Sequence, residues 1–96
     1  VGMSCYPLGL LKQAIERCQL DVVISYCHFN LQDRTLLGEL LPTAAEHGVG
    51  VLNGSPLGMG LLTNQGPQAW HPGGDDIKAA CRAAAELCRI QGGDIS

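Results

Sequence analysis

The stretch most informative about the fold is Val49-Gly-Val-Leu-Asn-Gly-Ser-Pro-Leu-Gly-Met-Gly-Leu-Leu-Thr63. It begins as a short apolar strand and continues as a segment rich in glycine, which we call the glycine loop (residues 55–63). Because glycine has no side chain, backbone N–H groups in such a loop can approach a ligand closely. Folds that alternate strands and helices make their cofactor and phosphate contacts where a strand ends in a loop of this kind.

Two similar strand–helix units precede this segment. Residues 1–5 are interpreted as the end of a strand, and a β-branched run at 21–27 is typical of a buried strand. Residues 36–41 carry leucines at helical spacing, and Pro42 is expected either to kink that helix or to begin a second one. A helix after residue 7 is predicted to bury an apolar stripe formed by Leu8, Leu10, Leu11, Ala14, Ile15 and Cys18.

The third unit ends in another predicted helix. Asp75 is expected to cap its first turn, and Gly92 ends it. His47 is interpreted as a cap of the helix that Gly48 terminates, and His71 as a residue that orders the long loop. The last helix is predicted to bury Ile77, Ala80, Cys81, Ala84, Leu87 and Cys88.

The order of these elements indicates the fold class. Strands near residues 1, 22 and 49 recur about every 25 residues with helices between them, which predicts an α/β fold with a parallel sheet. Three strand–helix units are less than half of a (β/α)8 TIM barrel, so a partial barrel is expected. An open doubly wound sheet is the competing architecture, although the GxGxxG fingerprint is absent.

Composition excludes several function classes. The chain has 96 residues, 46% of them hydrophobic, and a net charge of -3, which is typical of one small globular domain. Its six lysines and arginines form no patch for nucleic acid, and no apolar run is long enough to cross a membrane. Five cysteines without CxxC spacing indicate reduced thiols and a cytoplasmic protein.

Polar side chains lie at the predicted carboxyl ends of the three strands, where α/β folds place their ligands. They are Ser4 and Cys5, then residues 26–28, then residues 53–55. A nucleophilic pair of Cys27 and His28 is not favoured, because adjacent residues on a strand point to opposite faces. A zinc site is favoured less still, since structural sites need four close ligands, and no general acid or base is evident.

The motifs together resemble the aldo-keto reductase family. Ser55-Pro-Leu-Gly-Met-Gly-Leu-Leu-Thr63 is similar to the loop after the seventh strand of that family. Residues 21–28 and Gly66-Pro-Gln-Ala-Trp-His-Pro72 look like its sugar-dehydrogenase branch, which includes the L-galactose dehydrogenases. The resemblance covers the whole chain, treated as one domain (1–96), and implies strands five to seven of a barrel that binds NAD or NADP without a Rossmann motif.

The resemblance also implies roles for individual residues. Ser4, followed by Cys5, would bond the nicotinamide carboxamide. The backbone amides of Ser55, Leu57 and Gly58 would face the pyrophosphate, and the loop would continue through Gly60 and Leu61. The branch oxidises the hydroxyl of a small sugar to a lactone.

The sequence departs from the family at several positions. Cys5 stands where most members have asparagine, and Gly54 where most have an aromatic ring stacked on the nicotinamide. The family's strand-six glutamine has no clear equivalent. Its catalytic Asp, Tyr, Lys and His would lie on earlier strands, so no catalytic residue and no metal ligand is assigned. Val1 is not a methionine, and a fragment of a longer protein is expected, neither folding stably nor turning over substrate alone.

Other readings remain open. The chain could be a non-catalytic α/β module that binds a phosphorylated ligand through residues 54–60, or a truncated remnant. The sugar, the oligomeric state and the choice between NAD and NADP are not determined by the residues present.

Overall fold

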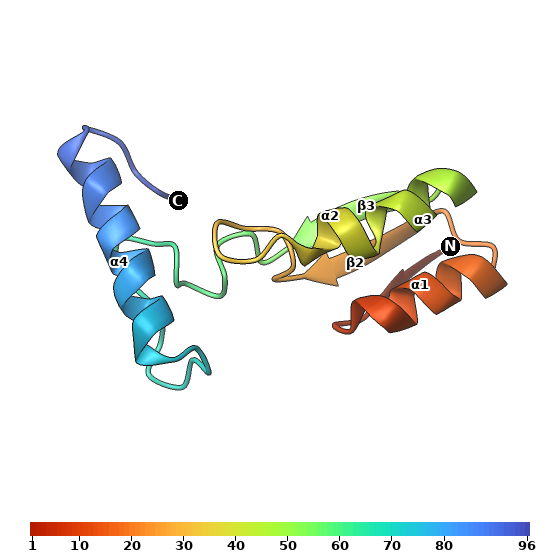
Figure 1. The fold of residues 1–96 in the computed structure, drawn as a ribbon, viewed down its shortest axis with the longest axis horizontal. Helices are drawn as coiled ribbons and strands as arrows, with labels where there is room; N and C mark the ends of the chain where they lie inside the picture. Colours follow the sequence, from red (N-terminus) through yellow and green to blue (C-terminus); the bar gives the residue numbers. More distant parts are fainter. The chain divides into compact units, whose positions relative to one another are not determined.

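The computed structural model describes all 96 residues, which form two compact units, Val1–Pro56 and Leu57–Ser96. The first unit is built on a sheet of three parallel strands in the order β1-β2-β3 (Figure 1). These strands are β1 (Gly2–Ser4), β2 (Val22–Tyr26) and β3 (Gly50–Gly54). The predicted α/β class is confirmed, and the arrangement is that of a partial TIM barrel.

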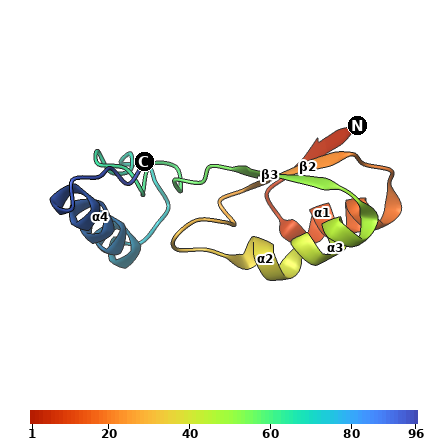
Figure 2. The ribbon, with the colours of Figure 1, turned by 90° about the horizontal axis from the view of Figure 1, so that it is seen from above.

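Three helices belong to the first unit: α1 (Leu8–Arg17), α2 (Thr35–Glu39) and α3 (Leu41–His47). They cover the same face of the sheet, as Figure 2 shows from above. Apolar side chains from these helices pack on β2 and form the core, because a parallel strand gains stability when its face is covered. The core consists of Leu8, Leu11, Ile15, Val23, Leu36, Leu40, Ala44 and Val49.

The strand register defines two faces of the sheet. Ser4 pairs with Ile24, and Tyr26 pairs with Gly54. Side chains alternate along a strand, and Val23 and Ser25 are fully buried on the face that the helices cover. The opposite face, which we call the open face, carries Ser4, Val22, Ile24, Tyr26 and Leu52, and Leu52 is 54% exposed.

Several helix ends follow their predicted chemistry. Pro42 is the second residue of α3, so it begins a second helix where its missing N–H costs little. Gly48 ends α3 with φ 67°, a left-handed conformation that glycine adopts without strain. His47 Nδ1 donates to the carbonyl of Thr43 at 3.0 Å, which confirms its predicted capping role.

The apolar stripe predicted for α1 includes more residues than the helix buries. Leu8, Leu11 and Ile15 face the sheet, whereas Leu10 is 52% exposed because it lies off this narrow face. Cys18 is also exposed, since it follows the helix in an extended conformation.

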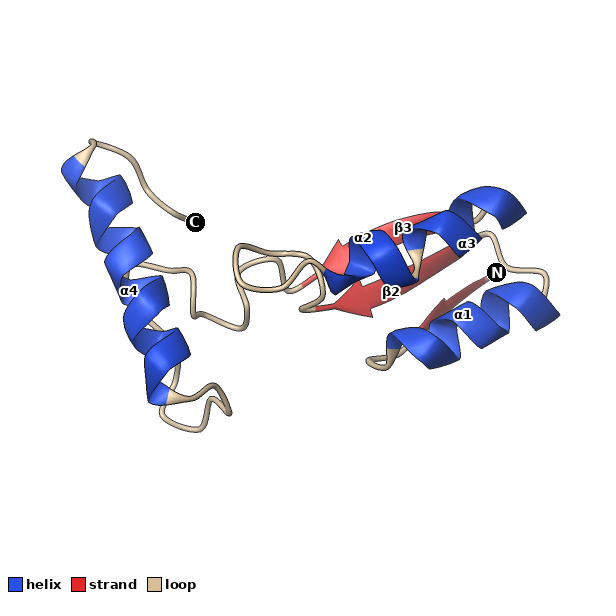
Figure 3. Ribbon diagram, viewed as in Figure 1, coloured by secondary structure: helices blue, strands red, loops and turns tan.

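The second unit consists of a long loop and one helix, α4 (Asp75–Ile90), as the tan and blue ribbon of Figure 3 shows. The predicted cap by Asp75 is wrong: Gly74 occupies the N-cap, no side chain caps the helix, and Asp75 already lies in the first turn. The predicted stripe is only partly right. Of the predicted residues Cys81 is buried, whereas Ile77, Ala80 and Leu87 are exposed, because the small cluster of Leu61, Leu62, Leu57 and Ile95 packs on only part of the helix. Ala85, which was not predicted, is buried as well.

No helix in the structure is both long and apolar enough to span a bilayer. None of the five cysteines forms a disulfide bond. Burial raises the pKa of the Cys81 thiol, which therefore stays protonated near neutral pH and packs as a small apolar group.

Two neighbouring leucines of α1 test this packing. Leu11→Ala in the full-length protein should lower the free energy of unfolding by about 2–5 kcal/mol, because it leaves a cavity in the core. Leu10→Ala is the matched control and should cost about 0.5 kcal/mol, since that side chain is half exposed. Denaturant unfolding measures both, and equal losses would contradict the assigned face of α1.

Candidate functional site

The carboxyl ends of the three strands lie at the same edge of the sheet, because the strands are parallel. Ser4 is exposed there at the end of β1, and Cys5 and Ser55 are half-buried just beyond β1 and β3. The Cys5 thiol donates to the carbonyl of Pro7 at 3.5 Å. The structure thus brings three of the predicted cofactor residues to one edge of the first unit.

The backbone is strained at two positions of this edge. Cys27 has φ 62° and Ser55 has φ 52°, and each directly follows the last residue of a strand. A non-glycine residue in this left-handed region costs on the order of 1–3 kcal/mol and is concentrated at functional sites. The Cys27 N–H donates to the carbonyl of Gly54 at 3.0 Å, so the two strained turns are joined across the sheet.

Side chains for which the sequence predicted no structural role hold the loop after β2 in place. Ser25 is fully buried, and its hydroxyl bonds Nδ1 of His28 at 3.2 Å. The ring of Tyr6 lies 4.9 Å from that imidazole. Asn53 donates from Nδ2 to the carbonyl of Phe29 at 2.8 Å. His28 is therefore positioned by Ser25 and not coupled to Cys27.

The same loop is tightened near its end by two polar residues. Asn30 Oδ1 accepts the backbone N–H of Asp33 at 2.8 Å, and Asp33 accepts both the N–H and the hydroxyl of Thr35. The hydrogen bonds from the hydroxyl and the N–H of Thr35 hold the pKa of the Asp33 carboxyl below its usual value. No group of three or more potential ligands is placed to hold a metal ion.

Some backbone amides of the glycine loop form hydrogen bonds within the chain and others do not. Leu61 N–H donates to Gly58 at 3.3 Å, and Leu62 N–H donates to Leu57 at 3.0 Å, which closes two turns. The amides of Ser55, Leu57, Gly58, Met59 and Gly60 donate to no acceptor in the chain. Four of these amides, those of residues 57–60, lie in the second unit. Backbone N–H groups in glycine-rich turns commonly bind anions, so these four are the candidate donors.

His71 fixes this loop, as predicted. The imidazole is buried, Gly73 N–H donates to its Nδ1 at 2.9 Å, and its Nε2 lies 3.0 Å from the carbonyl of Gly58. Because Nδ1 accepts, Nε2 must carry the proton and donate, which assigns the neutral tautomer. Trp70 stays 69% exposed and contacts the His71 ring at a centroid distance of 6.2 Å.

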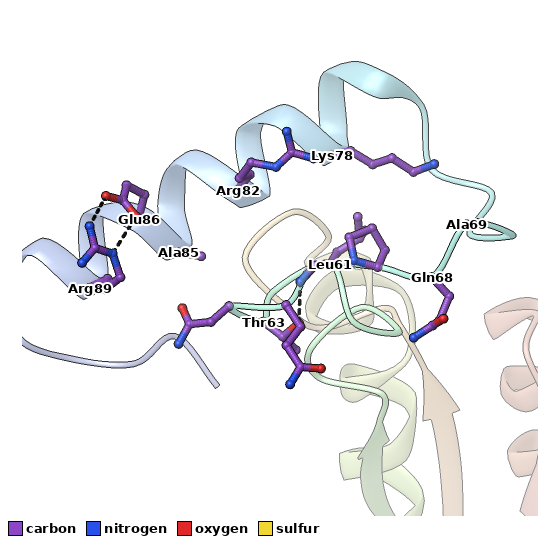
Figure 4. Close-up of a pocket in the computed structure, with 13 residues that line it drawn as sticks. Leu61, Thr63, Gln68, Ala69, Lys78, Arg82, Ala85, Glu86 and Arg89 are labelled. Atoms are coloured by element: carbon purple, nitrogen blue, oxygen red, sulfur yellow. Dashed lines mark hydrogen bonds and ion pairs between the residues drawn. The ribbon is translucent and has the colours of Figure 1, made fainter.

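A separate pocket of about 320 Å³ lies within the second unit, between the segment 61–69 and α4 (Figure 4). Lys78 and Arg82 line it from the helix, and the amides of Asn64 and Gln68 line it from the loop. Glu86 and Arg89 form a bidentate ion pair at its rim, and these hydrogen bonds lower the pKa of Glu86. The pocket contains only one of the predicted cofactor residues, Leu61.

The predicted residues of the second unit differ in what they offer a ligand. The amides of Leu57, Gly58 and Gly60 have no acceptor in the chain, although Gly58 is buried, whereas Leu61 has both its amide and its side chain engaged within the protein. Their role in cofactor binding stays a prediction. Ser25 was missed, and the only signal in the sequence was a polar residue inside an apolar strand. Asn53, predicted among the strand-end polar residues, instead donates its amide to the carbonyl of Phe29.

Comparisons with known proteins agree on one family. The model of the aldo/keto reductase family matches residues 1–96. L-galactose dehydrogenase of Arabidopsis thaliana is 42% identical over 99 residues, covering 100% of this chain. D-arabinose 1-dehydrogenase of Saccharomyces cerevisiae is 33% identical over 105 residues, covering 99% of it. The chain spans 31% of the length of each of these relatives.

The role of His71 is tested by hydrogen exchange in the full-length protein. His71→Ala removes both hydrogen bonds, each worth about 1 kcal/mol, so the amide of Gly73 should exchange at least several-fold faster. Trp70→Ala is the control and should leave that rate unchanged, because Trp70 is exposed. An unchanged Gly73 rate in His71→Ala would show that another contact orders the loop.

Proposed function

Because the chain belongs to the aldo/keto reductase family, we propose that it is part of an NAD(P)-dependent dehydrogenase that oxidises an aldose to its lactone. The single observation that best supports this is that two relatives, each matching essentially the whole chain, are both named as dehydrogenases of aldoses. Of the two sugars, L-galactose is the better candidate, since the relative named for it is 42% identical and the other is 33% identical.

The glycine loop has the chemistry that a dinucleotide requires. The unengaged amides of residues 57–60 are hydrogen-bond donors suited to a pyrophosphate, and residues 55–63 include no acidic side chain that would repel it. Ser4 lies at the same edge of the sheet as Ser55, with a hydroxyl that has no partner in the chain and can bond a carboxamide. Cys5 is a weaker partner for that amide.

These residues bind and orient; they do not carry out acid–base chemistry. When bound, the nicotinamide supplies the hydride acceptor, and the role of Ser4 and of the loop amides is to hold it in place. The catalytic tetrad implied by the resemblance belongs to strands outside residues 1–96. Residues 1–96 alone are therefore expected to be inactive.

The activity is tested with the purified full-length protein. L-galactose with NAD or NADP should yield reduced nicotinamide, followed by its near-ultraviolet absorbance, and D-arabinose should be a poorer substrate. A sugar alcohol of the same length is the control, because it has no anomeric hydroxyl. Cofactor binding without turnover of any aldose would instead favour a non-catalytic binding module.

Ser4 is tested by a single substitution. Ser4→Ala should weaken the affinity for the reduced cofactor roughly three- to tenfold, the effect of one lost hydrogen bond. Fluorescence titration of the full-length protein measures the dissociation constant. Ser96→Ala removes another exposed hydroxyl, one that bonds only Asp94, and should leave the affinity unchanged. Unaltered binding by Ser4→Ala would remove Ser4 from the site.

A further inference from the structure

Tyr26 and Gly54 form a closely packed pair at the carboxyl edge of the sheet. They are partners in the register, as the last residues of β2 and β3. A Cβ atom at Gly54 would lie 2.6 Å from Cδ1 and 2.9 Å from Cε1 of Tyr26. The aromatic ring therefore occupies the space that a side chain at position 54 would fill, and only glycine leaves room for it.

The ring lies on the open face of the sheet. Ser25, its neighbour, is fully buried on the helix-covered face, so alternation directs Tyr26 the other way. The missing Cβ of Gly54 points to the same side, because it meets the ring. Helices α1, α2 and α3 all lie on the opposite face of the sheet (Figure 2), and Tyr26 on the open face is half-buried.

Ser4 is on the same face, one strand away. It pairs with Ile24, two residues before Tyr26, which places the Ser4 and Tyr26 backbones roughly 8 Å apart by ordinary sheet spacing. A hollow of about 170 Å³ adjoins Ser4 and is lined by Gly2, Met3, Ser4, Val22 and Ile24. A flat ring that carries a carboxamide matches this arrangement, since its ring can stack while its amide bonds the hydroxyl.

We propose that the ring of Tyr26, seated on Gly54, is the surface on which the nicotinamide ring stacks. This inference rests on the proposed function, because it requires a nicotinamide cofactor. Two other aromatic side chains follow the strands at this edge and are less suited to the role. The ring of Tyr6 packs on His28, and Phe29 lies in the loop after β2, whereas Tyr26 belongs to the strand itself.

The test compares two ligands in the full-length protein. The reduced cofactor contains the nicotinamide, whereas ADP-ribose (or its 2′-phosphate, if NADPH is preferred) contains the pyrophosphate without that ring. Tyr26→Ala should weaken binding of the reduced cofactor roughly three- to tenfold and leave binding of the ribose compound unchanged. Tyr26→Phe should behave as the wild type, because it keeps the ring, and so should Tyr6→Ala.

A double substitution tests the shared space. Gly54→Tyr alone should weaken cofactor binding, because two rings compete for one position. Combined with Tyr26→Ala it should recover affinity relative to either single variant, while thermal melting confirms that each variant is folded.

The outcomes separate the two proposals. Equal weakening of both ligands by Tyr26→Ala would overturn the stacking role and leave the proposed function standing. A wild-type protein that binds neither NADH nor NADPH would overturn both.

Discussion

The parallel pairing of β2 with both of its neighbours is the constraint on which the first unit depends. β2 is the only strand bonded on two sides, and its buried residues Val23 and Ser25 anchor the sheet to the helices. Parallel pairing also forces all three strands to end at one edge. Residues as distant in sequence as Ser4 and Ser55 thereby reach the same rim without any direct contact between them. The geometry of the site is in this sense a consequence of strand direction.

Much of this arrangement was accessible from the sequence. The β-branched run of β2, the break at Pro42 and the left-handed stop at Gly48 each reflect a local preference that tertiary packing does not oppose. Burial was less accessible, because it depends on which surface a helix meets. Leu10 and Leu87 are as apolar as Leu11, yet both stay exposed, since the elements around them cover only a narrow stripe of each helix.

The structure around the candidate site was predictable where it depends on local sequence and unpredictable where it depends on a contact across strands. The glycine loop could be predicted from its composition, and the ordering role of His71 from its place in the long loop. The packing of Tyr26 on Gly54 could not be predicted in this way, because the two residues are 28 positions apart in the sequence and only the strand register brings them together. A glycine at the end of a strand is an ordinary turn signal until the ring above it is known. The same holds for Ser25, whose hydroxyl acquires a role only through His28.

The glycine loop combines well-ordered turns with backbone amides that have no acceptor in the chain. Two of its amides, those of Leu61 and Leu62, are used to close turns, and the side chains of the same residues are buried beside Cys81. The carbonyl of Gly58 accepts two hydrogen bonds, from the backbone N–H of Leu61 and from the imidazole of His71, which holds this turn in place. The remaining amides are thus left without partners by a loop that is itself well bonded. Ordering a loop in advance lowers the entropic cost of binding, so the anion binding that we propose for these amides would cost less than in a flexible segment.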